Sequence, residues 1–340
     1  MIETGYDGAV WAVAFDTDGV HILSGKDDGL RQWGIADGQE VGNQMGMNAV
    51  MAISVSRDGK WIVCGSRNGA SVWDAKTQEN AIEVEDTEYV GAVDISPEST
   101  RFATGAGLNE DYNASIWNIT TGERLVGPLQ HSSFVSVIKF SPNGEHIATM
   151  SWNHSIRVFD SHNANQLIAI RVKTDMPSSW PSTPLAWSND GQQIFAAWSD
   201  RKIKSFDVST GSQLAESQVD GGGMVTSIAL AANGKFLATF AGRSISFWDT
   251  FTLTQIGPVI KNSQSMWSID LSPDCSCLAT GGGGGHIAIR NLYNILPDLY
   301  GPFRVSIHAF AILSDKSHNI FPLLISPLGT HSRRGWIRKT

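Results

Sequence analysis

The chain has 340 residues and a net charge of −8, with 19 basic and 32 acidic side chains in residues 1–300; nucleic acid is not an expected partner, because so acidic a body repels phosphate backbones. Its three cysteines lack C-x-x-C spacing, which argues against a disulfide framework or a zinc site and indicates a reducing compartment, the cytosol or the nucleus. An N-terminus without an apolar segment, and the absence of any apolar run of about 18 residues, argue against a signal peptide and a membrane span.

The predicted elements recur along the chain at a fixed period. An alternating apolar run ends in a tight-turn sequence seven times: "FDTDG" (15–19), "VSRDG" (55–59), "ISPES" (95–99), "FSPNG" (140–144), "WSNDG" (187–191), "LAANG" (230–234) and "LSPDC" (271–275). A second phrase follows each turn, and its central residues are Trp33, Trp73, Trp117, Phe159, Phe206, Trp248 and Arg290. The gaps between them are 40, 44, 42, 47, 42 and 42 residues, which is the signature of a repeat architecture.

Each copy predicts three short strands, and the fourth copy shows them clearly. "VSVIKF" (135–140) is followed by a turn whose Asn and Gly tolerate left-handed backbone, then by "HIATMS" (146–151) and "SIRVFD" (155–160). Extended stretches between copies, such as "RLVGPLQ" (124–130), provide a fourth strand. Sheets with two apolar faces need a neighbour on each side, so the sequence predicts an all-β, seven-bladed β-propeller of four-stranded antiparallel blades within residues 1–300.

The repeats resemble the WD40 family over about residues 5–295. The Trp-Asp pair that ends such repeats is intact at Trp73-Asp74 and Trp248-Asp249, and the other copies drift from it. The array looks most like fungal WD40 repeat-like proteins, in which it often follows a nucleotide-binding NACHT module, and the sequence contains no such module. The family also uses a buried His, Ser/Thr, Trp and Asp hydrogen-bond chain; no copy has the full set, and we expect His131 to link blades rather than to act in catalysis.

Residues 301–340 lie outside the repeat and form a basic C-terminal extension, with six basic side chains against one acidic. Within them "FRVSIHAFAIL" (303–313) alternates well enough to be a strand, and we predict that it completes blade seven, with "MIETG" (1–5) contributing at most partly. The alternative is a chain that is a fragment, which leaves blade seven ragged. The rest of the extension, residues 314–340, has no assignable role.

Motifs for chemistry are weak. The run "GGGGGH" (281–286) lacks the Lys-Ser/Thr of a phosphate-binding loop and is interpreted as a structural turn. Asp94 and Asp270 occur singly on inner strands, where we expect them to be solvated or to link blades, and "CSC" (275–277) has a spacing that rarely binds metal. The sequence therefore predicts no catalytic residue, no cofactor and no metal, and a protein that is not an enzyme.

Tryptophans offer a candidate interaction face. Four positions before the last large apolar residue of each first strand, the copies hold Trp11, Met51, Gly91, Ser136, Thr183, Thr226 and Trp267. The resemblance implies that this position lies at the rim of the central channel. Trp267, Trp11 and Met51 would then form one apolar arc across blades seven, one and two, with small residues elsewhere on the rim. Trp152 and the loop 176–184, which contains Trp180, are predicted on the same face; the alternative is that each Trp packs between blades.

These observations predict a non-catalytic scaffold that binds a protein or peptide partner on its loop faces, as a monomer or as a subunit of a larger complex. Two alternatives stay open. A nucleotide-binding domain encoded beside or upstream of this chain would favour a detached WD40 sensing array of a NACHT-type receptor. A metal bound to the purified protein would favour a propeller enzyme.

Overall fold

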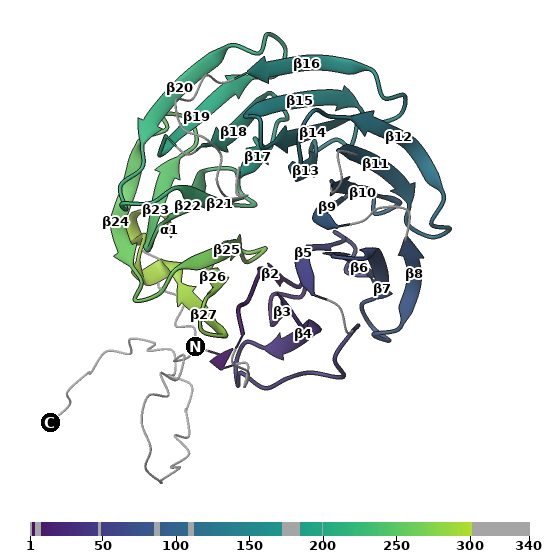
Figure 1. Ribbon diagram of the computed structural model, residues 1–340. Helices are drawn as coiled ribbons and strands as arrows, with labels where there is room; N and C mark the ends of the chain where they lie inside the picture. Colours follow the sequence, from purple (N-terminus) through teal and green to yellow (C-terminus); the bar gives the residue numbers. More distant parts are fainter. Residues whose placement is uncertain are drawn as a thin grey trace, which may run out of the picture. The chain divides into compact units, whose positions relative to one another are not determined.

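The computed structural model describes residues 2–3, 8–46, 49–84, 89–107, 112–171, 184–198 and 200–300. Within them, 27 strands form seven antiparallel sheets that surround a central channel as the blades of a propeller (Figure 1). Two short helices, η1 (Leu292–Asn294) and α1 (Pro297–Tyr300), follow the last strand. The predicted all-β, seven-bladed propeller is confirmed.

Every blade places its strands in order from the channel outward. The inner strands are β2 (Ala12–Phe15), β5 (Val50–Val55), β9 (Val90–Ile95), β13 (Val135–Phe140), β17 (Leu185–Trp187), β21 (Val225–Leu230) and β25 (Met266–Leu271). The second strands are β3 (His21–Lys26), β6 (Trp61–Ser66), β10 (Arg101–Ala106), β14 (His146–Ser151), β18 (Gln193–Ala197), β22 (Phe236–Ala241) and β26 (Cys277–Gly282). The third strands are β4 (Gly29–Gly34), β7 (Gly69–Asp74), β11 (Asn113–Asn118), β15 (Ser155–Asp160), β19 (Lys202–Asp207), β23 (Ser244–Asp249) and β27 (His286–Asn291). The outer strands are β1 (Ile2–Glu3), β8 (Asn80–Val84), β12 (Arg124–Gln130), β16 (Gln166–Arg171), β20 (Gln213–Gln218) and β24 (Gln255–Lys261).

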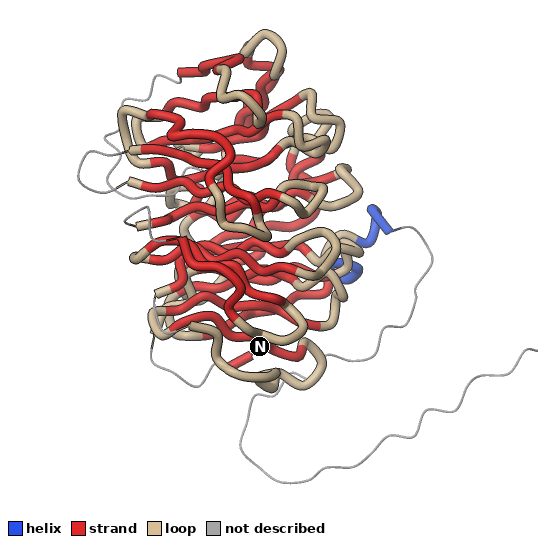
Figure 2. Tube along the Cα trace, turned by 90° about the vertical axis from the view of Figure 1, so that its right-hand side faces the viewer, coloured by secondary structure: helices blue, strands red, loops and turns tan. Residues whose placement is uncertain are grey.

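Seen from the side, the strands run between two faces that carry the loops (Figure 2). The upper face is the one that carries the loops leading into the inner strands and the loops joining second to third strands. The lower face carries the turns between inner and second strands, and both helices lie on it. No helix among the described residues is long and apolar enough to cross a membrane.

Blade one departs from the predicted four strands. Its sheet has three, and the place of the outer strand holds only two isolated bridges, Leu30 to Met45 and Trp33 to Glu40. Gly42 and Gly46 have φ of 74° and 72°, a left-handed backbone that interrupts an extended strand. Within the part of the chain that the structure describes, the other six blades have four strands each.

The ring closes through the N-terminus. Strand β1 pairs with β27, with Ile2 opposite Ile287, and the Ile2 side chain is buried in the core shared by blades seven and one. This two-residue strand agrees with the partial contribution expected of residues 1–5. Residues 303–313 lie outside the described residues, so their pairing with blade seven stays a prediction.

In four blades the large residue near the end of the third strand donates a hydrogen bond to a hydroxyl of the second strand, in addition to its packing. Indole N–H groups of Trp33, Trp117 and Trp248 donate to the hydroxyls of Ser24, Thr104 and Thr239 at 2.8, 2.9 and 2.8 Å. Arg290 stands where blade seven would hold its Trp, and its guanidinium donates to the Thr280 hydroxyl at 3.2 Å. The most divergent copy thus keeps the same donor-to-hydroxyl contact, because a buried hydroxyl requires a partner.

His131 links blades three and four, as expected. One ring nitrogen lies 2.7 Å from the Leu129 carbonyl of β12, and the other lies 2.8 Å from the Thr149 hydroxyl of β14. Burial lowers the pKa of His131 to about 4, so the imidazole is neutral at physiological pH. A neutral, fully engaged imidazole serves as a structural link.

Glycine sets the spacing of four consecutive blade-to-blade seams. The fifth residue of the second strand is glycine in blades seven, one, two and three: Gly281, Gly25, Gly65 and Gly105. A Cβ there would lie 2.5 to 2.9 Å from a valine methyl of the next blade, whereas blades four, five and six hold Met150, Ala197 and Phe240 at this position. The glycine run 281–285 therefore serves packing in addition to the predicted turn.

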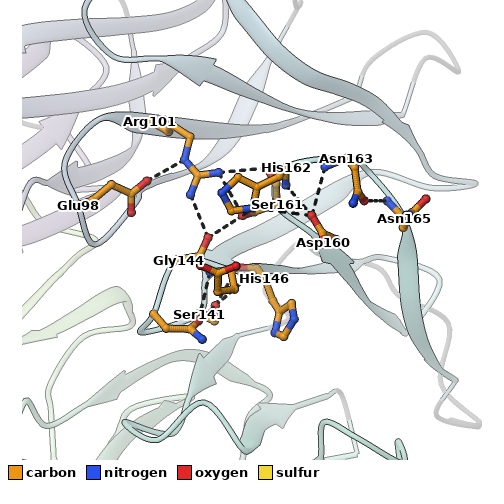
Figure 3. Close-up of polar contacts among 12 residues, drawn as sticks. Glu98, Arg101, Ser141, Gly144, His146, Asp160, Ser161, His162, Asn163 and Asn165 are labelled. Atoms are coloured by element: carbon orange, nitrogen blue, oxygen red, sulfur yellow. Dashed lines mark hydrogen bonds and ion pairs between the residues drawn. The ribbon is translucent and has the colours of Figure 1, made fainter.

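An arginine clamp joins blades three and four on the lower face (Figure 3). Arg101 donates to the Glu98 carboxylate at 2.7 Å, to the Gly144 carbonyl at 3.0 Å, and to both oxygens of Ser161 at 3.1 Å. Its side chain is 12% exposed. Since one planar guanidinium satisfies four acceptors from two blades, it fixes their relative position.

Candidate protein-interaction face

The inner strands enclose a cavity of about 1480 Å³ to which all seven blades contribute. Small side chains line much of its wall, among them Ala12, Ala14, Ala52, Ala92, Ala186 and Ala229. The lower end is lined by turn residues such as Thr17 and Pro273, and larger side chains gather at the upper mouth.

A bulge in the inner strand aims one residue of each of five blades at this mouth. The pairing of inner and second strands skips a residue at Met51, Gly91, Ser136, Thr226 and Trp267. All five line the cavity. Since a β-bulge turns its extra residue away from the regular alternation, the bulge explains why a position inside an apolar strand carries side chains into the channel.

Trp11 and Trp267 stack on each other across the seam that closes the ring. Their ring centroids are 4.6 Å apart at an interplanar angle of 22°. Trp267 is 37% exposed and Trp11 is partly buried, so neither indole is sunk between the sheets. The Trp11 indole N–H donates to the Asp27 carboxylate at 3.0 Å, and Met51, partly buried, lines the mouth on the next blade.

A second aromatic group, which the sequence did not lead us to expect, continues the arc onto blades three and four. Tyr89 meets Phe134 edge-on at 5.5 Å, and Phe134 packs against Trp152 at 4.7 Å. The prediction of only small residues on the rest of the rim is incomplete: a Cβ on Gly91 would lie 2.6 Å from the Phe134 ring, so this ring covers the small residue.

The predicted face residues thus fall into three groups. Trp267, Trp11 and Met51 lie together on the mouth as one arc. Trp152 lies on the upper face but reaches the channel only through Phe134. Trp180 lies outside the described residues, as does Thr183. The signal for the missed residues is an aromatic directly before the first buried valine of the inner strand, as in Tyr89-Val90 and Phe134-Val135.

Comparison with known proteins agrees with this architecture. A family profile described as "WD domain, G-beta repeat" matches residues 2–33, 39–74 and 124–160, which fall in three of the seven repeats. These three segments carry WD40 repeats.

Curated proteins of this kind are similar to parts of the WD40 array. The small ribosomal subunit protein RACK1 of Drosophila melanogaster is 30% identical over 125 residues, 36% of this chain and 38% of its own length. The serine-threonine kinase receptor-associated protein of Gallus gallus is 27% identical over 194 residues, 55% of this chain and 50% of its own. RACK1 of Caenorhabditis elegans is 30% identical over 128 residues, 36% and 38% of the two chains. Each match spans half or less of the relative's length.

Charged side chains on the inner WD40 strands link blades, as expected. Asp94 accepts the Phe140 N–H of the next blade at 2.8 Å and the Lys139 ammonium at 2.8 Å. Burial alone lowers the pKa of Lys139, but the Asp94 carboxylate raises it by more. The pKa of Lys139 therefore lies above its ordinary value, and Lys139 stays charged. Asp270 accepts the Phe15 N–H across the closing seam at 2.8 Å, and burial raises the pKa of Asp270 to about 6.

Asp16, Asp18 and His21 are the one group among the described residues whose metal-type ligand atoms lie within 4.8 Å of one another. They belong to the lower-face turn of blade one. His21 Nδ1 lies 2.5 Å from the Asp18 carboxylate, and Asp16 accepts the Gln32 amide at 3.1 Å. These contacts stabilise the tight turn that the repeat predicts at this position.

Proposed function

We propose that the upper mouth of the channel binds a protein or peptide partner and that the chain acts as a non-catalytic interaction scaffold. The observation that carries this proposal is the stacked pair of Trp11 and Trp267, which remains accessible at the mouth rather than buried between blades. Accessible tryptophans clustered with methionine are typical anchors of protein interfaces, because they bury much apolar area at little conformational cost.

Similar proteins support an interaction role. One is named as a component of the small ribosomal subunit and another as associated with serine-threonine kinase receptors, and both names describe members of larger assemblies. These similarities support the proposed role of a protein-interaction scaffold in the broad sense. That the upper mouth is the surface used, and that a peptide can occupy it, is our proposal.

Residues that could serve catalysis in the channel already have structural partners. Asp94 and Lys139 hold each other and the next blade, and Asp270 accepts two backbone N–H groups, from Phe15 and Leu271. Since these three charged groups are tied to seams, the proposed role of the channel is binding rather than bond chemistry.

The proposed compartment is the cytosol or the nucleus. All three cysteines are buried and free, and burial raises the pKa of Cys64 and Cys277, so both thiols stay protonated at neutral pH. We propose a protein partner rather than nucleic acid or membrane, since residues 1–300 are strongly acidic.

The test is a double variant with a matched control. W11S/W267S removes both indoles from the mouth, whereas L125S/L167S removes two leucines, 48% and 51% exposed, from the outer strands of blades three and four. Each tagged full chain is used to capture proteins from a homologous cell extract, which are identified by mass spectrometry. We expect W11S/W267S to lose the partners that wild type and L125S/L167S retain.

Thermal unfolding shows whether the loss is one of binding. Replacing two partly buried, stacked indoles by serine should cost about 3 kcal/mol, from the apolar area they bury and from their ring contact. In a chain of this size that lowers the Tm by only a few degrees, so W11S/W267S should still unfold in one cooperative transition. A double variant that is unfolded, or one that is folded and captures every wild-type partner, contradicts the proposal.

A further inference from the structure

We propose that Trp11, Trp267 and Asp27 together form a subsite for a cationic side chain, preferably arginine, of the partner. This inference rests on the proposed function, since it names the chemistry by which the upper mouth recognises that partner.

The stacked pair offers an aromatic surface for a cation. Each indole covers one face of the other at 4.6 Å, and Trp267 remains 37% exposed. The face of an indole carries the strongest negative quadrupole of the natural side chains, and a cation within about 6 Å of the ring centroid is attracted to it. A stacked pair has this surface already ordered, so little conformational entropy is lost on binding.

Asp27 supplies a carboxylate beside the pair. It is exposed, and one of its oxygens accepts the Trp11 indole N–H at 3.0 Å. A carboxylate has about four acceptor positions, so the group can also accept from a ligand. The hydrogen bond polarises the Trp11 indole toward its ring, which strengthens its attraction for a cation.

Other charges direct a cation to this part of the mouth. The neighbouring Lys26 is only 2% exposed, so its ammonium group is not presented at the surface of the mouth, whereas the Asp27 carboxylate is exposed. The basic residues that line the cavity are Arg57, Arg67 and Lys139, on blades two and four, and Lys139 is held by Asp94. Residues 1–300 carry 32 acidic against 19 basic side chains, so the overall field also favours a cationic ligand at the Asp27 end.

Arginine fits this site better than lysine. Its planar guanidinium can stack on an indole and at the same time donate hydrogen bonds from its edge to a carboxylate. The ammonium of lysine is more strongly hydrated and makes one of these contacts at the expense of the other.

The experiment uses indole N–H resonances of the full-length protein. The chain has 12 tryptophans, and spectra of W11F and W267F assign the two signals of the pair. The probes are N-acetyl-arginine amide and its uncharged isostere N-acetyl-citrulline amide, at equal ionic strength. We expect the arginine probe to shift both signals with a Kd on the order of 10 mM, and the citrulline probe to shift them at least about threefold less.

Two charge variants decide whether Asp27 takes part. D27N should reduce the shift produced by the arginine probe at least about threefold, whereas E145Q, at an exposed carboxylate on the lower face, should leave it unchanged. Equal shifts with both probes, shifts confined to other indoles, or a response insensitive to D27N would overturn the inference.

The two proposals fail separately. If W11S/W267S loses its partners while the arginine probe leaves the pair unshifted, the mouth binds by apolar contact alone and the cation subsite is wrong. If the probe binds but the double variant keeps every partner, the subsite exists and the proposed role of the mouth in partner binding is wrong.

Discussion

Two seams of the ring, between blades three and four and between blades seven and one, are built alike. In each, a glycine of the second strand faces a valine of the next blade, Gly105 with Val135 and Gly281 with Val10. In each, an inner-strand aspartate accepts a backbone N–H of the next blade at 2.8 Å. Both carry aromatic pairs on the upper face, edge-on for Tyr89 and Phe134 and stacked for Trp11 and Trp267.

They differ in how charge is compensated. Asp94 has Lys139 as an ion-pair partner, and Arg101 clamps the lower face of the same seam. Asp270 has no ion-pair partner among the described residues. At its seam, the outer strand of blade seven is β1, which has only two residues. The first seam is therefore held by an ion pair in addition to packing and hydrogen bonds, whereas the described part of the closing seam has packing and hydrogen bonds alone. This makes the closing seam the expected place for the ring to open first.

The largest expected effect is a loss of stability at acidic pH that arises in only one of the two seams. His131, in the seam between blades three and four, has a pKa lowered to about 4 by burial. Between its ordinary value near 6.5 and 4, the unfolded chain binds a proton that the native state does not, so stability is lost as pH falls through this window, by about 3 kcal/mol in total.

Denaturant unfolding of wild type and H131Q from pH 7 to pH 4 measures this loss. H131Q keeps a polar side chain without the titration, so the wild type should lose stability relative to H131Q as the pH falls. An unchanged difference between the two proteins across the range would show that His131 titrates normally and is not buried as described.

Packing at the closing seam should give the next largest effect. In G281A the added Cβ would lie 2.5 Å from the Val10 methyl and 2.7 Å from that of Val13, so the seam must spread, at a cost of about 2 kcal/mol. In the matched control G283A the nearest atom is 3.7 Å away.

Urea unfolding of both variants tests this difference, with V10A added to G281A to restore the space. We expect a lower midpoint for G281A, partial recovery in the double variant and no change beyond about 0.5 kcal/mol for G283A. Equal midpoints for G281A and G283A would mean that the blades are less tightly seated than the structure shows.

The smallest effect is the opposite pH response of the closing seam. Burial raises the pKa of Asp270 to about 6, so between that value and about 4 the native state binds a proton that the unfolded chain does not, and this group contributes more stability as pH falls. D270N keeps an acceptor for the Phe15 N–H but loses the charge.

We therefore compare the unfolding free energy of D270N with that of wild type. We expect this difference to favour D270N by about 1 kcal/mol more at pH 7.5 than at pH 5, after allowance for solvent screening. Unfolding free energies at the two pH values give the difference directly. If the difference between D270N and wild type is the same at both pH values, Asp270 is ionised throughout this range and solvated.

Much of this architecture could be predicted from the repeat. The spacing of Trp33, Trp73 and their equivalents indicates seven sheets, because a period of about 40 residues with three apolar strands cannot bury its faces except in a ring. Asp94 and Asp270 could be placed on the seams for the same reason, since their position in the repeat places them on the inner strand.

The remainder depends on the register between strands and on contacts between blades, neither of which is visible in the pattern of a single strand. The bulge at Trp267 arises from how β25 aligns with β26, and the ring of Phe134 reaches Gly91 from another blade. Strand β1 has two residues, which is too short for any alternation to be visible. Contacts of this kind appear only when the neighbouring blade is in place.

The central claim is that the stacked indoles at the channel mouth anchor a partner and are not part of the core. The most direct test is to compare W11S/W267S with wild type in the same capture experiment while thermal unfolding monitors the fold. We predict a propeller that unfolds cooperatively within a few degrees of wild type and captures none of its partners. A folded double variant with undiminished capture would contradict the claim.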